Sequence, residues 1–140
     1  MKRLFFILLV LVFMSAPAMA QTWYNANQAT FAWDAVTTLV GGAAIPAGST
    51  VKYQAYRKLS PATVGEKVGN EVSTPSALVS FTSEGSYFVG AEALRYVGTT
   101  LVSRSTISYS DVPANCQGGA AFGFQYWLAL AAPTAYRPVP

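Results

Sequence analysis

The side chains that could do chemistry in this 140-residue chain are few: six carboxylates, one thiol and no histidine. Without histidine, the Ser/His and Cys/His pairs that activate a nucleophile are excluded, and so are zinc sites built on histidine or on several cysteines. Two carboxylates could still form the pair of a glycosidase. No motif suggests such a pair, and each carboxylate fits a turn or a solvated strand face. They are Asp34, Glu66, Glu71, Glu84, Glu92 and Asp111.

Sites for phosphate, metal or cofactor have no sequence signal either. The glycine-rich stretches lack the Lys-Ser/Thr ending of a phosphate-binding loop, and no Asp-x-Asp run supplies carboxylates for calcium. Cys116 has no identifiable activating base. As an odd thiol it forms an intermolecular bridge or serves as a small apolar side chain of the fold. We therefore expect a non-catalytic protein without a cofactor or metal.

Aromatic side chains are the remaining candidates, because exposed rings can stack on sugars or anchor protein contacts. Four rings within strand patterns are expected in the core: Trp33, Tyr53, Phe81 and Tyr87. A second set is predicted to supply partner contacts, with half-buried packing as the alternative. This set is Trp23, Tyr24, Tyr56, Tyr126, Trp127 and Tyr136.

Residues 1–20 have the pattern of a secretory signal peptide. A positive start is followed by an apolar run over residues 4–14, and small side chains at Ala18 and Ala20 mark a cleavage site. The run of 11 residues is short of the roughly 20 that a membrane-spanning helix needs. We therefore expect cleavage after Ala20 and a secreted or periplasmic protein, with no transmembrane span left after the leader is removed.

Removal of the leader leaves 120 residues, which is enough for one domain with a core that needs no disulfide. Lys2 and Arg3 leave with it, so seven basic and six acidic residues remain and the mature chain is nearly neutral. No cluster of Lys or Arg is left to neutralise phosphates, which argues against nucleic-acid binding.

The composition after the leader is typical of strands and turns, with many Val, Thr, Tyr and Ser residues separated by Gly and Pro. No window of helical length shows an apolar stripe, so the sequence predicts an all-β fold, an antiparallel sandwich of short strands. The expected strands are residues 22–24, 29–36, 50–58, 66–73, 77–81, 86–95 and 101–110. In the third strand the more polar set of alternate residues should face solvent: Lys52, Gln54, Tyr56 and Lys58.

Three segments carry a recognisable order of residues. In the segment 31–34 a core tryptophan is followed by a polar residue, and the segment 53–57 has the sequence Tyr-Gln-Ala-Tyr-Arg. In the segment 81–91 an apolar residue stands six positions before Tyr87, with glycine between them. Together they resemble a fibronectin type III domain, an immunoglobulin-like sandwich. The resemblance implies that Tyr87 is a tyrosine-corner residue, and that the protein is an adhesion module, a spacer or an appendage.

A tail of residues 114–140 lies beyond the sandwich domain of residues 21–113. Within the tail, residues 122–130 alternate large apolar and other side chains, which predicts an extra C-terminal strand. This strand either completes the sandwich or pairs with a partner through its edge.

The function expected first is that of an exported binding or structural module, which contacts protein or glycan through loops and exposed aromatics. The alternative is a subunit of a cell-envelope or surface assembly, a homo-oligomer joined through the C-terminal strand or Cys116. A small carbohydrate-active enzyme that uses acidic residues is the last alternative.

Overall fold

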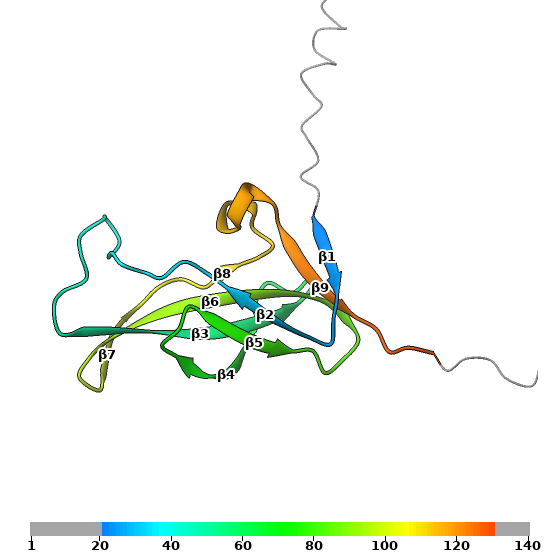
Figure 1. Ribbon diagram of the computed structural model, residues 1–140, viewed down its shortest axis with the longest axis horizontal. Helices are drawn as coiled ribbons and strands as arrows, with labels where there is room; N and C mark the ends of the chain where they lie inside the picture. The colour runs from blue at the N-terminus through cyan, green and yellow to red at the C-terminus, as the bar shows by residue number, and fades with distance from the viewer. Residues whose placement is uncertain (1–20, 131–140) are drawn as a thin grey trace, which may run out of the picture.

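The computed structural model describes residues 21–130, so the leader expected over residues 1–20 and the candidate contact Tyr136 lie outside the described part. Nine strands and two short 3-10 helices follow one another in this part (Figure 1). The strands are β1 Thr22–Asn25, β2 Gln28–Ala32, β3 Ser49–Leu59, β4 Glu66–Val72, β5 Ser76–Ser80, β6 Gly85–Val97, β7 Thr100–Arg104, β8 Ser108–Tyr109 and β9 Phe122–Tyr126. The 3-10 helices are η1 Pro113–Asn115 and η2 Gln117–Gly119.

These strands form the two sheets of an all-β sandwich, as the sequence predicts. The larger sheet has the order β1-β9-β6-β3-β4, and β7 and β8 also pair with β6. The smaller sheet is the antiparallel pair β2-β5, which lies over one face of the larger sheet (Figure 1). The long strand β3 pairs along its whole length with residues 87–97 of β6, and the two strands form the centre of the molecule.

Aromatic rings fill the core between the sheets. Phe81 stacks on Tyr87 with a centroid distance of 4.9 Å and on Phe124 with a centroid distance of 5.4 Å. Val79 and Val89 are fully buried beside them. Of the four rings expected in the core, three are buried and the last is half-buried: Tyr53, Phe81 and Tyr87, and then Trp33.

The turn before β6 is closed by a tyrosine. The Tyr87 hydroxyl donates a hydrogen bond of 2.6 Å to the Ser83 carbonyl. A bond from a tyrosine hydroxyl back to the backbone a few residues upstream is the defining contact of a tyrosine corner. It holds the chain that enters β6 against the start of that strand.

Three short strands share one edge of β6. β7 pairs with its last residues, β8 with Gly90 and Ala91, and β9 with its first residues. Between β8 and β9 the chain leaves the sheet over residues 111–121, and the amide of Phe122 closes this excursion by donating to the carbonyl of Ser110 at 3.0 Å. β9 therefore continues the line of β8 along the sheet. The prediction of a single strand over residues 101–110 is wrong, because this segment is divided into β7 and β8.

The C-terminal strand is an internal strand of the large sheet. β9 pairs antiparallel with β6 on one side and parallel with β1 on the other. Both of its edges are therefore occupied by strands of the same chain. It is also shorter than expected, because it ends at Tyr126 and residues 127–130 follow it as irregular chain.

The far face of the large sheet carries a second buried layer, and here the expectation from sequence is wrong. Three of the four β3 side chains expected to face solvent are at most 9% exposed: Gln54, Tyr56 and Lys58. Rings from distant parts of the chain cover them, since Trp23 packs on Phe88 at 5.2 Å and Tyr109 lies against the ammonium of Lys58.

The buried polar ends of these three β3 side chains each have a partner. The Tyr56 hydroxyl donates to Glu92 at 2.8 Å, and the Lys58 ammonium donates to Asp111 at 2.6 Å. The amide nitrogen of Gln54 donates to the carbonyl of Val68 at 3.1 Å. Polar groups can be buried at low cost when they are hydrogen-bonded in this way.

Candidate functional site

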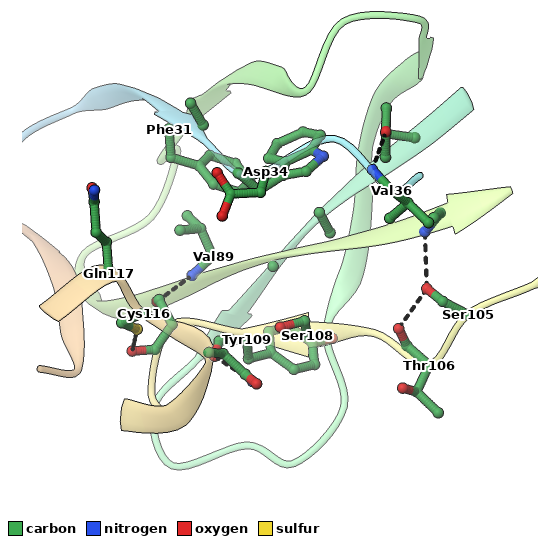
Figure 2. A pocket seen from close by; sticks show the side chains of 18 of the residues that line it. Phe31, Asp34, Val36, Val89, Ser105, Thr106, Ser108, Tyr109, Cys116 and Gln117 are labelled. Carbon is green, nitrogen blue, oxygen red and sulfur yellow. Dashed lines mark hydrogen bonds between the residues drawn. The ribbon is translucent and has the colours of Figure 1, made fainter. Parts of the chain in front are cut away.

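A pocket of about 710 Å³ opens between the two sheets where the small sheet ends. We call it the groove. One wall is β2 and the segment 33–36, the floor is β6, and the other wall is β8 with the excursion of residues 111–121 (Figure 2). It exists because β2 and β5 are too short to cover the whole face of β3 and β6.

Small residues in the middle of β6 form the floor of the groove. On the groove face, Ala91 and Ala93 replace the larger side chains that fill the core elsewhere, and Gly90 between them and Val89 contributes only its backbone. At Gly90 a Cβ atom would lie 2.6 Å from the ring of Tyr109 and 2.8 Å from the carbonyl oxygen of Ser108. Glycine is therefore required for β8 to approach β6 closely, and the two alanines leave the space above them open.

The wall on the β2 side is aromatic. Phe31 packs on Trp33 with a centroid distance of 5.1 Å, and Trp33 packs edge-on against Tyr53 at 5.4 Å. The Tyr53 hydroxyl accepts a hydrogen bond of 2.9 Å from the amide of Val36, which fixes the segment after β2 over the floor. The indole nitrogen of Trp33 is buried and has no hydrogen-bond partner among the described residues.

Ser110 fixes the opposite wall. Its amide donates to the carbonyl of Val89 at 2.9 Å, and its hydroxyl accepts from the amide of Val89 at 3.2 Å. These two bonds hold the end of β8 on β6. From there the 3-10 helices turn Cys116 and Gln117 toward the groove (Figure 2).

The charge in the groove is small and lies at one end. Among the described residues that line it, Asp34 is the only ionisable carboxylate or cation, and its carboxylate points into the pocket (Figure 2). The other polar side chains of the lining are neutral: Ser105, Thr106, Ser108, Ser110, Asn115, Cys116, Gln117 and the hydroxyl-bearing Tyr53 and Tyr109. A pocket that combines an apolar wall with neutral polar groups on the opposite wall can bind and orient a ligand.

Cys116 lines the groove but is poorly suited to react. Its thiol is half-buried and donates to the carbonyl of Ser110 at 3.3 Å. Burial raises the pKa of the Cys116 thiol above its ordinary value. Since the thiolate is the reactive form, less of it is present at neutral pH than in an exposed cysteine.

We therefore expect iodoacetamide to modify Cys116 at pH 8 several-fold more slowly in the folded protein than in guanidinium chloride. Mass spectrometry of timed samples measures both rates, and free cysteine supplies the reference for the change of solvent. Equal rates in the folded and unfolded protein would show that the thiol is accessible.

The candidate partner contacts predicted from sequence do not converge on one site. Tyr56 is buried, and Trp23 is half-buried on the same far face of the large sheet. Tyr24 and Trp127 are more than half exposed, at 53% and 58%. Tyr126 and Trp127 line a separate pocket of about 440 Å³ together with Asn25, Ala26, Asn27 and Gln125.

Of the predicted contact residues that lie within residues 21–130, only Cys116 lines the groove. Sequence reasoning missed Asp34, Ser108 and Gln117 as groove residues. The signal that was available is the run of small residues at Gly90 and Ala91 in the middle of a long strand, which marks a place where packing leaves space or another backbone approaches closely.

Burial raises the pKa of Tyr56 to about 12, assisted by the hydrogen bond to Glu92 and the charge of that carboxylate. The tyrosinate absorbance of Tyr56 is the difference between the titration curves of wild type and Tyr56→Phe. We expect this absorbance to appear near pH 12 in the folded protein and near pH 10 in urea. The folded state holds this proton more tightly than the unfolded state does. Its contribution to stability is therefore complete below pH 10 and is lost as the pH rises from 10 to 12. A titration midpoint near 10 in the folded protein would show that Tyr56 is solvated.

No family model, curated protein or solved structure matches this chain. Within residues 21–130, no three His, Cys, Asp or Glu side chains come together as a metal site. The same residues contain no helix that is long and apolar enough to cross a membrane. The functional argument therefore starts from the groove.

Proposed function

We propose that this protein is an exported, non-catalytic binding module that holds a polypeptide partner in the groove. The observation that carries the proposal is the open pocket of about 710 Å³ between β2 and β8, in which an aromatic wall faces a wall of neutral polar side chains. A concave pocket with apolar walls and convergent polar groups is the usual place for a binding site. The signal pattern of residues 1–20 supports export.

Protein is favoured over glycan as the partner by the arrangement of the rings. Sugar stacking requires an aromatic face that is open to solvent. In the groove, Phe31 and Trp33 are half-buried and pack on each other and on Tyr53. Their exposed parts form an apolar wall, which is suited to aliphatic and aromatic side chains of a polypeptide.

A bulky substitution in the groove tests this function. Ser108 is exposed and lies opposite Ala91 on the groove side of β8, so Ser108→Tyr should fill the groove without disturbing the core. The probe is a library of random 12-residue peptides displayed on phage and selected on residues 21–140. We expect the selected peptides to bind Ser108→Tyr at least about tenfold more weakly than wild type, the effect of losing roughly 1.4 kcal/mol.

Thr100→Tyr is the matched control, because Thr100 is exposed on β7 outside the groove. It should bind the selected peptides as wild type does. Equal binding by Ser108→Tyr and wild type would contradict the proposal, and so would binding confined to sugars on a glycan array.

A further inference from the structure

β2 has an unpaired edge that borders the groove. Within the described residues it pairs only with β5. The carbonyl of Asn27 accepts from the amide of Phe81 at 2.8 Å, and the amide of Trp33 donates to the carbonyl of Pro75 at 3.0 Å. Backbone groups of an antiparallel strand alternate between its two sides. The amides and carbonyls of three β2 residues therefore point to the outer edge: Gln28, Thr30 and Ala32.

This edge lacks the features that usually prevent strands from pairing. The outer strand of the large sheet, β4, carries Glu66, Lys67 and Glu71 and is interrupted by Gly69 at a φ of +64°. Charges and irregularities of this kind protect an edge. β2 has the sequence Gln-Ala-Thr-Phe-Ala, with neither charge nor proline. Its five residues present an edge of about 16 Å to solvent.

The other edge of the same small sheet is partly covered. The guanidinium of Arg57 donates to the carbonyl of Ser80 on the outer side of β5. The outward carbonyls of β2 have no such partner in the described part of the chain. The edge that borders the groove is thus the more available of the two.

The groove lies on the inward side of this edge. A strand added beside β2 would send alternate side chains inward, over the space that Ala91 and Ala93 leave open. It would send the others to solvent, as Gln28 and Thr30 do. Asp34 lies two residues after the end of β2, so a positive charge at that end of the added strand would lie beside its carboxylate in the groove.

We propose that the polypeptide partner binds as an added β-strand. It is an extended segment that pairs with the outer edge of β2, places apolar side chains over Ala91 and Ala93, and carries a basic residue beside Asp34. This inference rests on the proposed function of the groove and names the class of partner. Main-chain hydrogen bonds to an exposed edge give affinity, and pockets for alternate side chains give specificity. A helical partner has no free backbone groups to satisfy the edge.

Proline substitution on the two edges of the small sheet tests the pairing. Thr30→Pro removes an amide that points to the open edge of β2. The hydrogen bonds between β2 and β5 are kept, whereas an added strand loses its pairing with β2. Leu78 pairs directly with Thr30, and its amide likewise points outward, on the β5 side. Leu78→Pro is therefore the matched control.

The probe is the synthetic 12-residue peptide most enriched by phage selection on wild type, and fluorescence anisotropy measures its affinity. We expect Thr30→Pro to weaken binding at least about tenfold, from the loss of backbone hydrogen bonds, and Leu78→Pro to leave it within twofold. In a second measurement the protein is wild type and the peptide is changed. N-methylation of every second peptide amide, in the set that would face β2, should weaken binding as strongly as Thr30→Pro does. This second measurement does not depend on the folding of a variant.

The outcomes separate the two proposals. Wild-type affinity for Thr30→Pro, or tolerance of N-methylation in both registers, would overturn strand pairing. If Ser108→Tyr still abolishes binding in that case, the groove keeps its proposed function with a different mode of recognition. If no peptide is enriched over an empty surface, both proposals fail.

Discussion

Replacing Phe124 by alanine is expected to lower the free energy of unfolding by about 3–5 kcal/mol, the usual cost of removing a buried phenylalanine. Phe124 is 8% exposed and stacks on Phe81 at the centre of the core. Its loss leaves a cavity that the stacked rings cannot close without shifting. The tail strand β9 is thus as much a part of the core as the strands that precede it.

Leu128→Ala is the control for this change, because Leu128 lies in the same tail but is 64% exposed. It should alter stability by no more than about 0.5 kcal/mol. Urea unfolding followed by tryptophan fluorescence and circular dichroism measures both variants. Similar losses for the two would mean that β9 does not contribute to the core as described.

Lys58→Met is expected to lower the free energy of unfolding by about 3 kcal/mol. The side chain of Lys58 is 9% exposed, its ammonium lies 2.6 Å from Asp111, and the ring of Tyr109 covers it at 4.4 Å. Methionine keeps the length and removes the charge, so the Asp111 carboxylate loses its partner while one of its oxygens is already buried without a bond. Breaking a buried pair costs about 3–5 kcal/mol, and the 27% exposure of Asp111 places this pair at the low end.

Two further variants make the Lys58 experiment decisive. Lys67→Met removes an exposed charge of β4 and should change stability by less than about 0.5 kcal/mol. The double variant Lys58→Met with Asp111→Leu replaces both partners by apolar side chains and should recover most of the loss. If the loss of unfolding free energy in the double variant equals the sum of the losses in Lys58→Met and Asp111→Leu, the two residues are not a coupled pair.

Much of the strand pattern could be predicted from the sequence, because alternation of side chains along a strand is a local property. The long strand β6 and its inward residues Tyr87 and Val89 follow from it. The position at which β2 ends does not follow from this alternation. The strand was expected to reach Val36 but stops at Ala32, where its partner β5 is preceded by Pro75, which has no amide to continue the ladder.

The buried layer on the far face shows the limit of the same reasoning. Gln54, Tyr56 and Lys58 are polar enough to predict a solvated face. They are buried because Glu92 and Asp111, which are distant in the sequence, bring them hydrogen bonds. The cost of burying a polar group depends on its partners, and partners at such separations are not visible in a local pattern.

The sequence by itself determined the all-β sandwich, since residue types and period-two alternation suffice for that. Only the tertiary structure decided which edges stay open. Among residues 21–130, β1 pairs with β9 on the large sheet and β2 pairs with β5 alone, so the groove and the free backbone groups of the bordering β2 edge arise together. Alternation tells which face a side chain takes, but the neighbour of a strand depends on long-range packing between distant segments.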